Sequence, residues 1–364
     1  MAGGRLNWID ALKGWGIFLV TFGHLRPWLP LETHIYSFHM CLFFFISGYL
    51  FRDSYDLPDY IMKRVKGILI PFLLWDLLAT IENIGEGHSV RESLARFLVI
   101  DGMPCWDAPI WFLLILFIVE AAYAVIMKIL HAFGPFRPPE RHGPKSSSAK
   151  RNPATGFSDA MHSFLTKGLI IMICLLLWIM IGSRRMHLLL NLVPMAMCFY
   201  TFGDLSKALF VRKKNISVPK AAAVIAVLAA ASLFFGNLHN IRISYTEGRF
   251  GNIYCCIIAA AAGTLLYFFL FYYFDILGNN KVLIYLGKNS LIIMASQYWL
   301  FKIYDIFSKK YFAVSVWHTR STIKAFIAAV VTICIILVVV NIYKRVFKNT
   351  PVMLKVSKYF GVNI

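Results

Sequence analysis

The chain has 364 residues, of which 59% are hydrophobic and only 15% are charged, and its formal net charge is +19. A soluble domain carries roughly 25% charged residues, so this composition excludes an ordinary soluble protein. The positive charge does not indicate a nucleic-acid partner, because the lysines and arginines lie in clusters between long hydrophobic blocks, where such residues orient a membrane protein.

Ten hydrophobic segments follow one another along the chain. We expect transmembrane helices at about residues 12–29, 36–51, 66–82, 109–130, 165–183, 187–205, 219–237, 252–274, 282–301 and 323–343. No small-residue cleavage site follows the first segment, so we interpret it as a retained helix. The sequence therefore predicts an all-α, polytopic protein with about ten transmembrane helices, forming a single domain over residues 1–364 in the lipid bilayer of the cell membrane.

The distribution of positive charge predicts the orientation of the chain. Most of the 37 lysines and arginines lie on one side if the N-terminus is inside, and positive residues accumulate on the cytoplasmic side. We therefore expect both termini in the cytoplasm. Residues 135–155 are rich in Pro, Ser, Lys and Arg, which predicts a flexible cytoplasmic loop at about residues 132–164.

The first segment contains ionisable residues, which are costly in a bilayer and therefore indicate function. Asp10 and Lys13 lie near the cytoplasmic end. His24 follows Lys13 by eleven residues, or about 16 Å along a helix, and an imidazole exchanges protons readily near neutral pH. The alternative interpretation is structural: His24 bonds to a neighbouring helix, and Lys13 reaches out to the interface.

The second segment begins with His39 on the outer side, where His24 is within reach across a tight hairpin. Two histidines there suggest a polar pocket, although His39 alone is equally explained as a helix cap at the interface. No third ligand is well placed, and the seven cysteines show no metal-ligand spacing, so we expect no metal site. Ser47, beside Gly48, is most simply explained by close helix packing.

The third segment begins with Arg64 and Lys66 and contains Pro71. Together with Lys13 on the same side, these cations form a cytoplasmic cluster suited to a ligand that carries phosphates. Each cation taken alone is explained equally well by ordinary anchoring on the cytoplasmic side.

Two later motifs and four scattered carboxylates complete the set of candidates. Trp111 opens the fourth segment and belongs either to an aromatic belt or to a surface on which sugars stack. Asn289 and Ser290 open the ninth segment, where they either cap the helix or hold a phosphate at its N-terminal amides. The acidic residues near span ends or interiors are expected to form structural pairs; they are Asp76, Glu120, Asp204 and Asp275.

These motifs, in this order, resemble the acyltransferase-3 family of integral membrane acyltransferases, and most closely its fucose 4-O-acetylase-type and other polysaccharide O-acetyltransferases. The residues that carry the resemblance are Asp10, Lys13, His24, Phe38-His39-Met40, Phe43 to Tyr49, Lys63-Arg64, Pro71, Trp75, Trp111-Phe112-Leu113 and Gly287 to Leu291. His24 matches the essential histidine of the family's first helix, and Lys13 stands where many members have arginine. Two positions depart from the family pattern, Gly67 in place of a basic residue and Gln297 in place of a histidine.

The resemblance implies that an acyl group, most simply acetyl, passes from acetyl-CoA to a hydroxyl of a cell-surface polysaccharide or its precursor. His24 then acts as general base or carries the acyl group, and His39 orients His24 or the acceptor. The residues expected at the donor are Lys13, Arg64, Lys66, Asn289 and Ser290, and those expected at the carbohydrate acceptor are Asp10, Ser47 and Trp111. The rival interpretations are a proton-coupled transporter or flippase for a polar or lipid-linked solute, and a membrane scaffold without activity.

Overall fold

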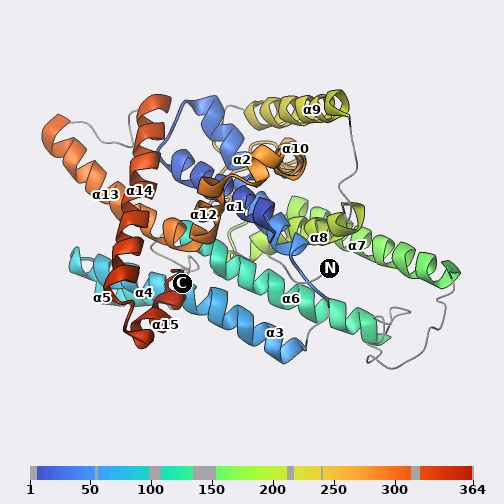
Figure 1. Ribbon diagram of the computed structural model, residues 1–364, viewed down its shortest axis with the longest axis horizontal. Helices are drawn as coiled ribbons and strands as arrows, with labels where there is room; N and C mark the ends of the chain where they lie inside the picture. The colour runs from blue at the N-terminus through green and yellow to red at the C-terminus, as the bar shows by residue number, and fades with distance from the viewer. Residues whose placement is uncertain are drawn as a thin grey trace.

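A computed structural model describes residues 6–53, 56–97, 108–133, 153–210, 217–238, 241–312 and 320–362, which form helices joined by loops (Figure 1). The helices are α1 (Asn7–His24), α2 (Leu29–Tyr49), α3 (Leu57–Arg64), α4 (Ile70–Gly85), α5 (Val90–Phe97), α6 (Trp111–Phe133), α7 (Pro153–Ile181), α8 (Val193–Leu209), α9 (Val218–Asn237), α10 (Ile253–Tyr273), α11 (Asp275–Gly278), α12 (Lys281–Lys288), α13 (Ser290–Phe312), α14 (Thr322–Val346) and α15 (Pro351–Tyr359). A π-helical turn (Val65–Leu69) joins α3 to α4, and short 3-10 turns precede α6 (Ala108–Ile110) and α8 (His187–Leu192).

Eight helical stretches in this part of the chain are long and apolar enough to cross a membrane. They are Leu29–Tyr49, Leu57–Gly85, Trp111–Ala132, Met161–Ile181, His187–Ala208, Val218–Asn237, Ile253–Tyr273 and Thr322–Val346. The protein is therefore an all-α, multi-pass membrane protein, which confirms the fold class predicted from the sequence. The number of ten spans and the cytoplasmic location of both termini remain predictions.

The two remaining expected spans correspond to helices of a different kind. α1 has 18 residues and includes Asp10 and Lys13, so its composition is more polar than that of the other spans. The ninth expected span is interrupted at Asn289, which ends α12 before α13 begins. Both α1 and α12 lie near the centre of the molecule (Figure 1), where neighbouring helices cover them.

The first two helices meet earlier than the sequence predicts. α1 ends at His24 and α2 begins at Leu29, whereas we expected the second span to begin near residue 36. The first turns of α2 are polar but buried, because Glu32 forms an ion pair with Arg242 at 3.5 Å and Thr33 bonds to Asn237. His39 consequently lies in the middle of α2 rather than at its start.

The third span is longer than predicted, because the amphipathic helix α3 continues into α4 through the π-helical turn. This turn lies between Arg64 and Pro71. Proline has no N–H to donate and disturbs the preceding helical bonds, and a single π-helical turn within a longer helix often accompanies a functional site.

α1 and α12 pack backbone against backbone. A Cβ atom on Gly14 would overlap the carbonyl group of Leu283, and a Cβ atom on Gly287 would overlap that of Asp10. Glycine at both positions is therefore what permits the contact. This packing brings the Gly287–Ser290 segment to the half of α1 that contains Lys13.

The outermost helices expose their apolar side chains. α7 and α9 are mostly exposed along their hydrophobic stretches, and α9 and α14 lie at the periphery (Figure 1). On α7 the exposed apolar residues include Leu165, Leu169, Met172, Leu176 and Met180. In a bilayer these side chains face lipid, so their exposure indicates no further interface.

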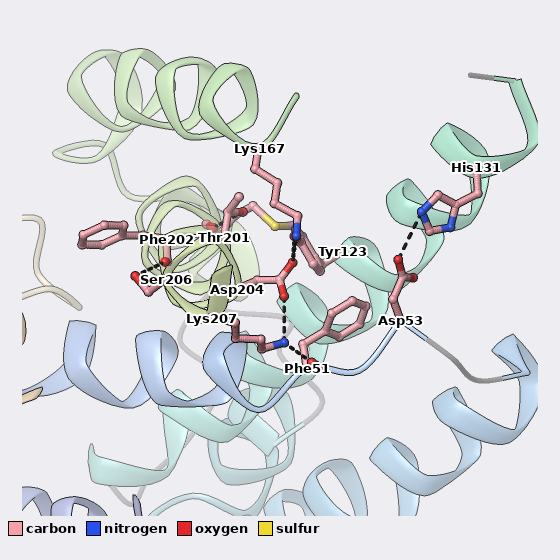
Figure 2. Close-up of polar contacts among 11 residues, drawn as sticks. Phe51, Asp53, Tyr123, His131, Lys167, Thr201, Phe202, Asp204, Ser206 and Lys207 are labelled. Carbon is pink, nitrogen blue, oxygen red and sulfur yellow. Dashed lines mark hydrogen bonds and ion pairs between the residues drawn. The ribbon is translucent and has the colours of Figure 1, made fainter. Parts of the chain in front are cut away.

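A polar cluster joins α6, α7, α8 and the end of α2 (Figure 2). Asp204 accepts hydrogen bonds from Tyr123 at 2.6 Å and from Lys207 at 2.7 Å, and it forms an ion pair with Lys167 at 2.7 Å. Lys207 also donates to the carbonyl group of Phe51, at the C-terminal end of α2. Asp204 thus forms the structural pairs expected of it, and the cluster holds four segments together without facing a cavity.

The loop expected at residues 132–164 falls largely on residues 134–152, which lie outside the described residues. Its last part is helical, since α7 begins at Pro153.

Candidate active site

A cavity of about 370 Å³ lies between α1, α2, α6, α13 and the loop of residues 241–252. Its lining includes His24, His39 and Trp111, three residues that the sequence analysis selected independently. Aromatic and sulfur-containing side chains complete one wall: Phe43, Phe112, Met40 and Met294. The cavity is large enough for a sugar unit together with an acetyl group, since ordinary ligand pockets begin at about 300 Å³.

The same nitrogen is unprotonated in both histidine rings. Nδ1 of His24 lies 2.7 Å from the carbonyl oxygen of Val20, and Nδ1 of His39 lies 2.8 Å from that of Ile35. A carbonyl oxygen only accepts hydrogen bonds, so Nδ1 carries the proton in both neutral rings. Nε2 is then unprotonated and is able to act as a base or as a nucleophile.

Tyr36 lies between the two imidazoles. Its ring centre is 5.7 Å from that of His24 and 4.9 Å from that of His39. Its hydroxyl group accepts a hydrogen bond from Arg242 at 2.7 Å. This tyrosine therefore lies close to both histidines and connects them to the loop of residues 241–252.

The loop of residues 241–252 supplies cavity residues that the sequence analysis missed. Ser244 and Arg249 form an antiparallel bridge, and Gly248 closes the turn with a φ of 64°. Arg242, Ser244, Tyr245 and Thr246 line the cavity. The turn-forming Glu-Gly pair at residues 247–248 predicts a tight turn, but nothing in the sequence indicates that this loop covers the histidines.

Tyr245 anchors this loop to α2. Its side chain is buried, and its hydroxyl group donates to the carbonyl oxygen of Ser37 at 2.8 Å. Farther along the loop, the hydrogen bond from Arg249 holds the pKa of Glu247 below its usual range. This second pair is exposed and does not line the cavity.

The basic residues expected at the donor lie elsewhere. Arg64 forms an ion pair with Glu120 of α6, with Nε 2.6 Å from Oε2, and its guanidinium group lies 4.7 Å from the ring centre of Tyr60. Lys13 is half-buried and interacts electrostatically with the same Glu120. Lys66 is exposed. The structure thus brings Lys13 and Arg64 together through a carboxylate that we had expected to form a structural pair.

Asn289 and Ser290 lie at the junction of α12 and α13. The side chain of Asn289 is buried and donates to the carbonyl oxygen of Tyr285 at 2.9 Å. Ser290 is half-buried as the first residue of α13. Gly361 packs against the backbone nitrogen of Ile292, so the C-terminal segment covers part of this helix start.

Two of the residues expected at the acceptor do not line the cavity. Asp10 is buried in the first turn of α1, where its carbonyl group contacts Gly287. Ser47 is half-buried and lies eight residues after His39 on α2, or about 12 Å along the helix. Gln297, which occupies the position of a family histidine, is buried without a hydrogen-bond partner among the described residues and does not line the cavity either.

Phe43 closes the end of the cavity nearest Lys13. Its ring packs on Gly16 of α1, and its ring centre lies 5.8 Å from that of Phe112. Gly16 lies between Lys13 and His24 on the same helix. Among the described residues, the lining of the cavity therefore ends before Lys13, Arg64 and Lys66.

Comparison with known families matches residues 6–340 to the family described as an acyltransferase domain. No curated protein and no solved structure matches the chain.

Proposed function

Because the chain belongs to the acyltransferase-3 family and is thus a membrane acyltransferase, we propose that it moves an acetyl group from acetyl-CoA to a carbohydrate hydroxyl at the outer side of the cell membrane. The observation that supports this proposal is the cavity that His24, His39 and Trp111 line together, with Nδ1 of each histidine bonded to its own helix. Aromatic rings stack on the apolar faces of sugars, and a basic nitrogen activates a hydroxyl group. The acceptor is a cell-surface polysaccharide or its precursor.

The donor enters from the cytoplasmic side in this proposal. Lys13, Arg64 and Lys66 bind its phosphates through charge-assisted hydrogen bonds, with Asn289 and Ser290 beside them. Eleven residues of α1 separate Lys13 from His24, or about 16 Å, a distance that the extended pantetheine arm spans. Because the ring of Phe43 lies on this path, it moves aside when the donor binds.

Transfer by a direct route uses His24 as general base. The acceptor oxygen attacks the thioester carbonyl carbon while Nε2 of His24 takes the hydroxyl proton. When the tetrahedral intermediate collapses, the carbon–sulfur bond breaks and the imidazolium returns the proton to the sulfur of the departing CoA.

A two-step route uses His24 as nucleophile. Nε2 attacks the carbonyl carbon, the carbon–sulfur bond breaks, and CoA leaves as the thiolate. The acceptor oxygen then attacks the acetyl-imidazole, the carbon–nitrogen bond breaks, and Nε2 of His39 takes the hydroxyl proton. The ring orientation of both histidines suits either route.

The test is the variant His24→Ala, assayed with radiolabelled acetyl-CoA. We expect acetyl transfer to fall by about 10²–10⁴-fold, the usual loss of a positioned base, while the protein inserts and purifies normally. The matched control is His187→Ala, which removes an exposed histidine outside the cavity and is expected to keep full activity. Wild-type transfer by a correctly inserted His24→Ala protein contradicts the proposal.

The same assay distinguishes the routes and the rival function. Label retained on His24 after rapid denaturation at neutral pH supports the two-step route, whereas label found only in the product supports the direct route. Movement of a solute across vesicles without CoA release would instead identify a transporter.

A further inference from the structure

The cavity that contains the two histidines is positively charged. Arg26 and Arg242 are part of its lining, and no aspartate or glutamate is found among the described residues that line it. Both arginines line the same cavity as the candidate base His24. A neutral sugar does not need guanidinium groups, because hydroxyl and amide groups suffice to bind it. Their presence indicates a ligand that carries negative charge.

Arg242 is held in place by Tyr36 and Glu32 of α2. It donates a hydrogen bond to Tyr36, its guanidinium carbon lies 4.1 Å from the centre of that ring, and Glu32 forms an ion pair with it at 3.5 Å. Glu32 is buried on α2, while 36% of the Arg242 side chain remains exposed. The arginine is thus preorganised by its partners and still presents N–H groups to the cavity.

Arg26 is held by the backbone of the turn after α1. It has a φ of 52°, in the left-handed region, and its N–H donates to the carbonyl oxygen of Gly23 at 3.2 Å. A residue other than glycine adopts this conformation only where the surrounding structure imposes it, and such positions cluster at functional sites. The turn places Arg26 two residues after His24, on the same cavity.

Several arginines gather around one carboxylate. Arg26, Arg242 and Arg320 all act electrostatically on Glu32. Arginine binds carboxylate and phosphate groups through paired N–H donors, and such bonds are strong where water is partly excluded.

We infer that the acceptor carries an anionic group, the carboxylate of a uronic acid or a phosphate, close to the hydroxyl that receives the acetyl group. Arg26 and Arg242 bind this anion, and His24 faces the neighbouring hydroxyl. The inference rests on the proposed function, because it names the acceptor class of the same site. The donor phosphates do not account for these arginines, since the donor enters beyond Phe43, near Lys13.

The experiment compares neutral acceptors with charged counterparts of the same sugars. The probes are methyl glycosides of glucose, galactose and mannose, the matching methyl glycosides of their uronic acids, and the matching hexose 1-phosphates. Acetyl transfer from radiolabelled acetyl-CoA gives kcat and KM for each, and calorimetric titration of the purified protein measures binding of the same probes without turnover. The protein variants are Arg26→Gln, Arg242→Gln and Arg242→Lys, with Arg249→Gln as the matched control. Arg249 lies in the same loop, is 67% exposed and is paired with Glu247 outside the cavity.

We expect at least one charged probe to bind at least tenfold more tightly than its neutral partner, and whether it is a uronic acid or a phosphate identifies the anion. Arg26→Gln and Arg242→Gln abolish this preference through KM, Arg242→Lys keeps part of it, and Arg249→Gln keeps all of it. The inference is overturned if charged and neutral probes bind alike, including the case in which none binds. It is also overturned if the arginine variants lower kcat equally for both kinds of acceptor, since Arg242 would then stabilise the tetrahedral oxyanion instead. Failure of the proposed function is a separate result, the absence of CoA release and transfer by the wild-type protein.

Discussion

In each cavity histidine, a hydrogen bond to the backbone of its own helix determines which ring nitrogen lacks a proton. Nδ1 of His24 and of His39 bonds to the carbonyl oxygen four residues earlier, so both Nε2 atoms lack a proton. The sequence identifies the two residues from their depth in hydrophobic segments. It does not reveal the tautomer, because that depends on the rotamer of each ring.

The ion pair of Arg64 and Glu120 leads to a prediction about stability. Glu120 is only 3% exposed, so removing either partner leaves the other without its nearest counter-charge in a poorly solvated place. We expect Glu120→Gln and Arg64→Gln each to lower the thermal stability of the purified protein, and the double variant to lose less than the sum. A coupling energy of about 1–3 kcal/mol is expected from a double-mutant cycle.

The control for this cycle pairs Arg64→Gln with Glu247→Gln, which lies in the loop of residues 241–252 and contacts Arg249. These two changes should add without coupling. If the stability losses of Arg64→Gln and Glu120→Gln add, the ion pair contributes little to stability.

Phe43 leads to a prediction about the path of the donor. Phe43→Ala removes the ring that packs on Gly16, so the cavity should extend toward Lys13 and admit the donor more readily. We expect CoA release in the absence of acceptor to rise several-fold, because water then reaches the thioester. Phe234→Ala, which removes an exposed ring on α9, should leave CoA release unchanged, and an unchanged rate in Phe43→Ala would show that the donor takes another path.

At the scale of elements, the contact of α1 with α12 leaves no room for a side chain at its glycines. Gly287→Val places side-chain atoms where the carbonyl group of Asp10 lies, so the helices must separate, and overpacking of this kind costs at least about 1–3 kcal/mol. We expect a clear fall in thermal stability and in the yield of inserted protein. Gly168→Val on α7, where no atom lies within 4 Å of the added Cβ, should leave both unchanged. Equal behaviour of the two variants would contradict the importance of this contact.

The sequence predicts the type of each long helix better than its ends. Hydrophobic composition identifies the spans, but it misses the start of α2, where Glu32 and Thr33 are polar and yet buried by partners from distant segments. The expected span at residues 282–301 crosses the break at Asn289, because α12 and α13 are both helical, although a helix cap at Asn289 and Ser290 is one of the two interpretations of that motif.

The sequence likewise does not predict the part of the candidate site that the loop of residues 241–252 supplies. His24, His39 and Trp111 stand out as polar or aromatic exceptions in hydrophobic segments. Arg242 and Tyr245 lie in an ordinary polar loop, and only the tertiary fold places them over the histidines.

At the scale of the whole molecule, the predicted orientation can be tested with two labelling positions. Arg52 follows α2 and Arg185 follows α7, and both are exposed. In a cysteine-free background, an impermeant maleimide should label Arg185→Cys in intact cells, and it should label Arg52→Cys only after the membrane is permeabilised. Three spans separate the two positions, so the reverse pattern would place both termini outside. This assignment of the termini holds for ten spans; with the eight spans alone, the expected pattern would place both termini outside.

The contact of the Phe43 ring with Gly16 also has a consequence for the leakage of ions through the protein in the proposed function. Membranes that store energy as a proton gradient lose it through any continuous file of water. An enzyme that brings a cytoplasmic thioester to an outward-facing hydroxyl brings two aqueous compartments close together inside one protein. In the function proposed above, the Phe43 ring moves only for the arm of the donor, so the acetyl group crosses while ions stay behind and the membrane keeps its gradient.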